Sequence, residues 1–249
     1  MDKTSQVIVT TSWDDGHPMD LKVADLLSEF DMQGTFYVAS NNRERAVMGT
    51  PDILALSNYF EIGAHSMTHP DLRRLNGQDL ENEIGGSKSE LEGVIGTPVH
   101  MFCYPKGKHN RRVRDAVVNA GFIGARTTRE FFLNTGPDPW QMVTTIMGGP
   151  LPRFIRLRHE MITGNWQGLK VLGRRGFSTS WVELACALFE EVLKTGGVWH
   201  MWSHSWQIDE LNLWDDLKVV LDTVAHREGV SYRTNGQLIG ELAKNHTID

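Results

Sequence analysis

The sequence lacks the features that define several large classes of protein. It has only two cysteines, Cys103 and Cys186, far apart in a chain of 249 residues, so we expect no disulfide framework. Its apolar runs, such as Val7–Val9, are far too short to cross a membrane. A basic excess is also missing, since 25 Lys and Arg stand against 31 Asp and Glu. This balance argues against a protein built to bind nucleic acid.

The sequence also shows no export signal and no linker. Met1–Gln6 carries no apolar signal core, so we expect a cytoplasmic location unless the sequence is a trimmed one. No long polar tract and no internal repeat divide the chain. Hydrophobic residues make up 40% of it, enough for a large buried core. We therefore expect residues 1–249 to form a single domain.

Strand-like and helix-like segments alternate along the chain, which is typical of an α/β protein and, at this length, of a barrel. The expected strands are Gln6–Trp13, Gly34–Ala39, Glu61–His65, His100–Tyr104, Phe122–Arg126, Val198–His204 and a short one from Tyr232. The expected helices are Met19–Phe30, Pro51–Tyr59, Asp79–Ile95, Arg112–Ala120, Trp181–Lys194, Trp214–His226 and Gly236–Ala243. Phe131–Phe177 is rich in proline and glycine, and we expect it to form a long loop over the mouth of the barrel.

Two adjacent carboxylates, Asp14 and Asp15, stand where the first apolar strand is expected to end. In a regular strand neighbouring side chains face opposite sides, so both carboxylates reach one pocket only if the chain turns there. Gly16 permits such a turn. Alone, Asp-Asp-Gly is more often an ordinary solvated turn.

Two histidines, His65 and His69, follow the third expected strand. At this spacing both imidazoles reach one metal ion if the residues between them form a helical turn or a tight loop. With Asp15 they supply the three protein ligands of an open catalytic metal site, and Asp14 remains as a general base. This combination indicates metal-assisted hydrolysis.

Four segments in fixed order extend this pattern: SWDDG at 12–16, HSMTH at 65–69, CYPKG at 103–107 and WSH at 202–204. Together they resemble the motifs of the polysaccharide deacetylase superfamily, also known as the NodB-homology or carbohydrate esterase family 4 group. The second motif is matched in full, whereas the third matches only at Pro105 and Gly107. The resemblance implies a distorted (β/α)7-type barrel.

The resemblance also implies a role for each matched residue. Asp14 is expected to be the general base and His204 the general acid that protonates the departing amine. Asp15, His65 and His69 are expected to hold a divalent metal, most often zinc, with cobalt, manganese or nickel as alternatives. The backbone N–H of Lys106 is expected to help stabilise the oxyanion, and Tyr104, in the same motif, is placed with it at the substrate.

The third and fourth motifs depart from the family pattern. The family's third motif carries an arginine that pairs with the catalytic aspartate, and Cys103 stands in its place. Arg126, at the end of the next expected strand, is the candidate for supplying that charge, against a role in substrate binding or a surface ion pair. Trp140 and Trp166 are equal candidates for the tryptophan of the fourth motif.

The late strand places His200, Trp202 and His204 on one face by its two-residue period. If His204 faces the mouth of the barrel, Trp202 lies just below it, where it contacts the acyl group or packs in the core. His200 lies deeper, as a hydrogen-bonded structural residue. Since the family often has an aliphatic residue at the position of Trp202, the indole favours formyl over acetyl as a working hypothesis.

The sequence therefore predicts a metal-dependent hydrolase that removes an acetyl or formyl group from an amino sugar, as a small molecule or an oligosaccharide. No nucleic-acid or membrane partner is expected. Two alternatives stay open: a hydrolase of non-sugar linear or cyclic amides, and a non-catalytic carbohydrate-binding relative. Loss of metal ligands, base or acid would indicate these alternatives, and all of those residues are present.

Overall fold

The structure is a computed structural model that describes residues 6–150 and 180–245, together with Met161, Trp166, Lys170 and Gly173. Its described strands form one curled parallel sheet in the order β5-β4-β3-β2-β1-β7-β6, with β8 paired to β1. β8 runs along the first half of β1 and β2 along its second half. The strands are β1 (Val7–Asp15), β2 (Thr35–Val38), β3 (Glu61–Ala64), β4 (Met101–Cys103), β5 (Gly124–Arg126), β6 (Ile146–Met147), β7 (Gly197–Ser203) and β8 (Val230–Tyr232).

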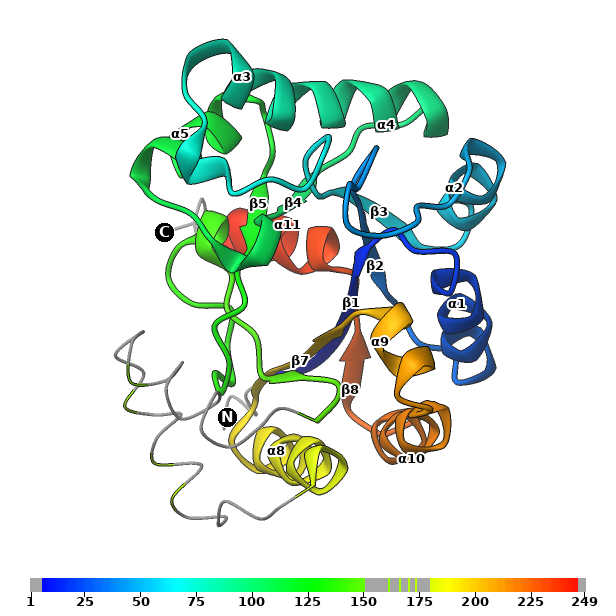
Figure 1. Ribbon diagram of the computed structural model, residues 1–249. Coiled ribbons are helices and arrows are strands. Elements are labelled where there is room, and N and C mark those ends of the chain that lie inside the picture. The colour runs from blue at the N-terminus through cyan, green and yellow to red at the C-terminus, as the bar shows by residue number, and fades with distance from the viewer. Residues whose placement is uncertain are drawn as a thin grey trace.

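Helices cover the outer face of this curled sheet (Figure 1). The α-helices are α1 (Asp20–Glu29), α2 (Thr50–Ser57), α3 (Gly77–Glu81), α4 (Ser87–Ile95), α5 (Arg111–Asn119), α8 (Trp181–Thr195), α9 (Ser205–Glu210), α10 (Trp214–Val224) and α11 (Asn235–Asn245). Short turns of other helix types are η1 (Leu72–Arg74), η2 (Asn82–Gly86), η3 (Pro105–Gly107) and η4 (Pro139–Gln141). α8 begins with a capping box in which Ser180 and Glu183 satisfy each other's backbone N–H groups.

Side-chain alternation along β1 separates two hydrophobic clusters. Val7, Val9 and Trp13 pack into the large cluster between sheet and helices, whereas Ile8 packs into a smaller cluster. Each fully buried aliphatic side chain of this kind contributes about 1.5–3 kcal/mol to stability. The alternation places Asp14 on the same face as Ile8, the inner face of the sheet.

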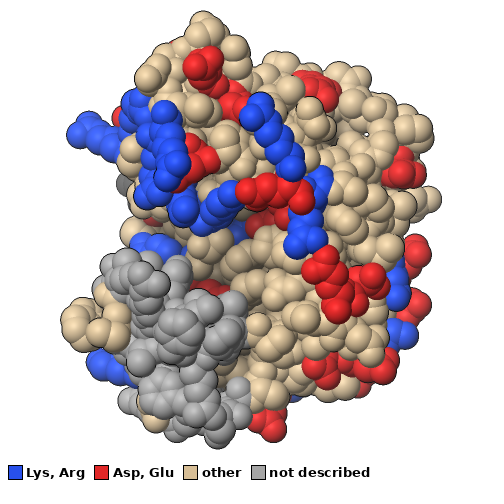
Figure 2. Space-filling model, viewed as in Figure 1, with Lys and Arg blue, Asp and Glu red and all other residues tan. Residues whose placement is uncertain are grey.

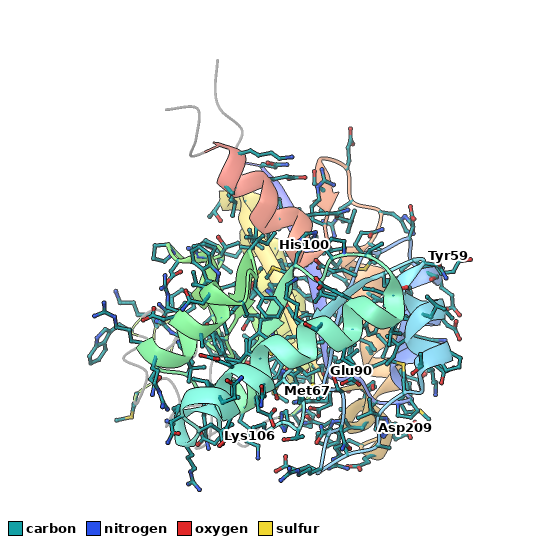
Figure 3. All side chains as sticks on the ribbon, turned by 90° about the horizontal axis from the view of Figure 1, so that it is seen from above. Tyr59, Met67, Glu90, His100, Lys106 and Asp209 are labelled. Atoms are coloured by element: carbon teal, nitrogen blue, oxygen red, sulfur yellow. The ribbon has the colours of Figure 1, made fainter. Side chains whose placement is uncertain are left out.

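Two segments close the curled sheet. Residues 142–148 bridge its edges, because Met142 N–H donates to Ala125 O of β5 and Thr145 N–H donates to His200 O of β7. α11 covers the end at which the strands begin, where Leu238 and Ile239 join the smaller cluster. In Figure 3, His100, just before β4, is labelled close to α11, whereas Lys106, just after β4, is labelled on the side of the molecule away from α11. The carboxyl ends of the strands therefore form an open mouth on the side away from α11.

These features confirm the predicted α/β barrel. The predicted helix Asp79–Ile95 is instead three pieces, because α3 and α4 are separated by the π-helical turn η2, which contains Gly85 and Gly86. The sequence did not indicate β6 or α9. Of the predicted loop Phe131–Phe177, the part from residue 151 on lies outside the described residues except for Met161, Trp166, Lys170 and Gly173. The single-domain assignment of residues 1–249 stays a prediction.

No helix in the part of the chain that the structure describes is long and apolar enough to span a membrane.

Candidate active site

The carboxyl ends of neighbouring parallel strands bring the predicted site residues together. β1 ends at Asp14 and Asp15, His65 follows β3, and His204 follows β7. Since all of these strands are parallel, their ends meet at one edge of the sheet. This is the end at which α/β-barrel enzymes place their catalytic groups.

Asp15 escapes the alternation of β1 through an unusual backbone conformation. Its φ is 83°, in the left-handed region, and Gly16 follows with φ 66°. The turn directs Asp15 to the same pocket as Asp14, as the sequence required. A Cβ atom at residue 16 would lie 2.8 Å from Val38 Cγ1 of β2, which is closer than van der Waals contact. Glycine, which has no Cβ, therefore allows the chain to pass this close to β2.

His65 and His69 reach Asp15 from a tight loop rather than a helix. Ser66 and His69 have φ of 65° and 56°, and Ser66 Oγ accepts a hydrogen bond from His69 N–H. The Nε2 atoms of His65 and His69 lie 3.8 Å and 3.5 Å from Asp15 Oδ1. One ligand atom from each of the three residues lies within 4.8 Å of the others. Two imidazoles and a carboxylate in this arrangement fit a divalent metal such as zinc.

The contacts of the two Nδ1 atoms leave Nε2 of each imidazole as the metal-facing atom. His65 Nδ1 lies 2.8 Å from Cys103 O, a carbonyl that only accepts, so Nδ1 carries the proton and Nε2 keeps its lone pair. His69 Nδ1 faces Glu44 Oε2 at 3.3 Å in the same sense. Burial lowers the pKa of His65 to about 4, so its imidazole is neutral at pH 7. Both rings are thus prepared for a metal.

Asp15 is oriented by two further hydrogen bonds. Asn42 Nδ2 donates to its Oδ1 at 3.2 Å, and Trp206 Nε1 donates to its Oδ2 at 2.8 Å. A second group, Asp14 with His65 and Cys103, also lies within 4.8 Å. Burial raises the pKa of the Cys103 thiol well above its usual value, and Asp14 is already paired with an arginine. The group around Asp15 therefore fits a metal better.

Asp14 forms a buried ion pair with Arg126. The guanidinium Nη2 donates to Asp14 Oδ1, and both side chains are almost fully buried. Burial alone would raise the pKa of Asp14, but the neighbouring positive charges, of which Arg126 is the strongest, and the Arg126 hydrogen bond together outweigh burial and hold the pKa at about 2. Cys103 and Arg126 are register partners on the parallel strands β4 and β5. Arg126 therefore reaches Asp14 from the strand next to the one that carries Cys103.

His204 faces the other carboxylate oxygen of Asp15, Oδ2, whereas His65 and His69 face Oδ1. The Nε2 atom of His204 lies 4.0 Å from Asp15 Oδ2, and its side chain is 20% exposed. Trp202 packs edge-on against it with ring centroids 5.5 Å apart, and the Arg126 guanidinium lies 4.7 Å from the centre of the Trp202 ring. His200 lies deeper and bonds Ser12 Oγ at 2.8 Å, which confirms its predicted structural environment.

These side chains line one open cavity of about 540 Å³, large enough for a sugar residue. Asp14, Asp15, His65, His69, Lys106, Trp202 and His204 all line it. Sequence reasoning missed the six other lining residues, which are Glu44, Arg45, Thr128, Glu130, Met147 and Trp206. Trp206 stacks under the Arg45 guanidinium, 3.7 Å from the ring centre. Trp206 follows His204 by two residues, and this nearness in sequence could have indicated that it lies at the site. It was missed because the sequence did not predict α9, the helix that turns Trp206 toward the cavity.

Four predicted residues do not line the cavity: Arg126, which is fully buried, Tyr104, Trp140 and Trp166. The Tyr104 side chain is fully buried, donates its hydroxyl hydrogen to Trp140 O and stacks on His109, so it faces away from the mouth. Trp140 donates its indole N–H to Phe122 O beside Tyr104. Trp166 is 74% exposed. The cavity takes its tryptophans from residues 202 and 206 instead.

A parallel α/β barrel with carboxylates and histidines at the carboxyl ends of its strands defines a class of barrel enzymes. The chain belongs to the polysaccharide deacetylase family. The sequence profile described as "Polysaccharide deacetylase" matches residues 2–125, which include the Asp14–Asp15 and His65–His69 segments. This match confirms the family that the motifs indicated.

Individual relatives are distant. Chitin deacetylase 1 of Cryptococcus neoformans is 24% identical over 60% of this chain and 36% of its own length. The peptidoglycan-N-acetylglucosamine deacetylase of Bacillus cereus is 21% identical over 64% of this chain and 58% of its own length. The chain thus spans less than two thirds of these relatives. A Mycobacterium smegmatis protein, solved as a candidate polysaccharide deacetylase, shares the fold with a TM-score of 0.69 at 13% identity, over 99% of this chain and 93% of that one.

Proposed function

We propose that this protein is a metal-dependent hydrolase that removes an N-acyl group from an amino sugar. The observation that carries the proposal is the convergence of a paired carboxylate, a metal-type donor set and a histidine on one cavity. Asp14, which is paired with the buried Arg126, lines the cavity together with Asp15, His65, His69 and His204. The names of the relatives, which deacetylate chitin and peptidoglycan sugars, support an acetylated saccharide as substrate.

Asp15, His65 and His69 would hold the metal. A divalent ion bound there would act as a Lewis acid, polarising the acyl carbonyl and lowering the pKa of the attacking water. Asn42 and Trp206 keep Asp15 in place by their hydrogen bonds, and Cys103 O does the same for His65. Such outer partners are typical of tight metal sites.

Asp14 acts as the general base in this proposal. Its pKa of about 2 keeps it ionised at neutral pH, and Arg126 fixes its orientation. It accepts a proton from the water that forms the new bond to the acyl carbon. Lys106 lines the cavity, and its backbone N–H would donate to the oxyanion that develops on the carbonyl oxygen.

His204 acts as the general acid on the far side of Asp15. It protonates the amine nitrogen as the carbon–nitrogen bond breaks, so the products are a free carboxylate and an amino sugar. Trp202 lies next to His204 and lines the cavity, where its indole would pack against the acyl group. An indole leaves less room there than an aliphatic side chain, which favours formyl over acetyl.

A substrate panel tests the proposal. The purified protein is loaded with zinc, cobalt, manganese or nickel and incubated with N-acetyl and N-formyl sugars, their oligosaccharides and sugar nucleotides, along with linear and cyclic non-sugar amides. We expect acetate or formate release from a sugar, with loss of release after chelation and recovery on adding metal. Release only from the non-sugar amides, or from none of the compounds, would contradict the proposal.

A further inference from the structure

Five exposed cationic side chains form a basic patch beside the mouth of the barrel. They are Arg73, Arg74, Lys106, Lys108 and Arg112. The patch is positively charged although the whole chain carries a net charge of -6. Figure 2 looks onto the mouth, and the Lys and Arg side chains gather at its upper left, over η1, η3 and the start of α5.

The basic patch is continuous with the cavity. Lys106 lines the cavity itself, and Lys108 follows two residues later on the same turn. Lys108 Nζ lies 3.9 Å from Asp71 Oδ2, and Asp71 follows His69 by two residues. The segment that carries a predicted metal ligand therefore leads directly into the patch.

Two ion pairs and one hydrogen bond to the backbone link the three arginines of the basic patch. Arg73 pairs with Asp71 at 2.8 Å, and Arg74 reaches the same carboxylate at 3.8 Å while its side chain stays 85% exposed. Arg112 Nη2 donates to Arg73 O at 3.1 Å. One carboxylate is thus shared by three cations, Arg73, Arg74 and Lys108.

Counter-charges within the described residues do not neutralise the basic patch. Its five cations face two adjacent carboxylates, Asp71 and Glu44, the latter paired with Lys106 at 2.6 Å. The neighbouring Arg114, by contrast, is matched by Asp138 at 2.8 Å. A cluster of like charges beside a cleft concentrates ligands of opposite charge and speeds their association.

We propose that the basic patch binds an anionic group, a carboxylate or a phosphate, on the saccharide whose N-acyl group enters the cavity. This inference rests on the proposed function. Because Lys106 belongs to both cavity and patch, a group attached to the reacting sugar or its neighbour reaches these cations. A long nucleic acid fits less well, since the negative charge of the rest of the chain repels it.

The experiment compares three probes that share an N-acetylated sugar. They are a chitin tetrasaccharide, which is neutral, a hyaluronan tetrasaccharide, which carries carboxylates, and uridine diphosphate N-acetylglucosamine, which carries phosphates. Acetate release is measured with the zinc-loaded full chain at about 20 mM and about 200 mM NaCl, between which the screening length falls from about 20 Å to about 7 Å. Binding of each probe is measured in parallel by calorimetry.

Two double variants separate the basic patch from overall charge. Arg74→Glu/Lys108→Glu reverses two exposed patch residues, and Lys194→Glu/Lys218→Glu makes the same charge change on the exposed surfaces of α8 and α10. We expect an anionic probe to exceed the neutral one about tenfold in kcat/KM at low salt. This preference should vanish at high salt and in the patch variant, and should remain in the control variant.

Other outcomes overturn one proposal or the other. Equal kcat/KM for neutral and anionic probes, or equal loss of preference in both double variants, overturns the anionic-group inference and leaves the hydrolase proposal standing. If none of the probes releases acetate, these sugars are not substrates. The calorimetric binding then tests the anionic-group inference, which is overturned if the patch variant binds the anionic probes as tightly as the parent protein does. Tighter patch-dependent binding of a DNA oligonucleotide than of either anionic saccharide would also overturn it.

Discussion

Removing the arginine beside Asp14 gives the sharpest view of how the candidate base is prepared. Arg126→Met leaves a buried carboxylate without its cation, and breaking such a pair costs about 3–5 kcal/mol of stability. Burial then raises the pKa of Asp14 above its value of about 2. During acidification the variant therefore protonates Asp14, and loses its base, at a higher pH than the parent protein does. Since a positioned base contributes about 100-fold to 10,000-fold, we expect kcat/KM at neutral pH to fall at least 100-fold.

The assay is acetate release by the zinc-loaded protein across the pH range, together with thermal unfolding. In Arg126→Met the acidic limb of the kcat/KM profile should move to higher pH, and Arg126→Lys should fall between it and the parent. Arg114→Met, which breaks a half-exposed pair with Asp138, is the matched control and should leave the profile in place. A folded Arg126→Met with kcat/KM within about threefold of the parent and an unmoved acidic limb would refute the reasoning.

If Arg126→Met does not fold, Asp14→Asn/Arg126→Met removes both charges and should recover most of the lost stability.

Three further predictions concern the metal, the acyl group and acid stability. Trp206→Phe removes the hydrogen bond to Asp15 and should weaken zinc binding about tenfold in a chelator competition, whereas Trp214→Phe should not; equal affinities would contradict this. Trp202→Leu should shift the formyl-to-acetyl ratio of kcat/KM about tenfold toward acetyl, and an unchanged ratio would count against the pocket assignment. Burial lowers the pKa of His200 to about 3, so between about pH 6.5 and pH 3 the unfolded chain binds a proton that the folded protein does not. The free energy of unfolding should therefore fall by about 1.4 kcal/mol for each pH unit of acidification in this range. His200→Gln should reduce this slope in denaturant titrations, and an unchanged slope would be inconsistent with the prediction.

The predictable part of the site is the part carried by short local patterns. The Asp14–Asp15–Gly16 turn and the His65–His69 loop were legible because each follows an apolar strand directly, and parallel strand ends meet at one edge. The pairing of Arg126 with Asp14 was reachable for the same reason, since Cys103 and Arg126 end adjacent strands in register.

The missed part depends on contacts distant in sequence. Glu44 and Asn42 lie in a loop without a strong pattern, and they reach His69 and Asp15 only through the fold. Trp206 lies on α9, a helix too short to show a clear period. Tyr104 was placed at the substrate by its motif, but the packing of its ring on His109 directs it away from the mouth.

The Asp14→Asn variant tests the central claim most directly. Amide for carboxylate keeps the shape of the side chain but removes its basicity, and it leaves Asp15, His65 and His69 untouched. We expect the purified variant to retain about one equivalent of divalent metal by elemental analysis and to lose acetate or formate release by at least 100-fold. Full activity in the metal-loaded variant would show that Asp14 is not the base and would contradict the account.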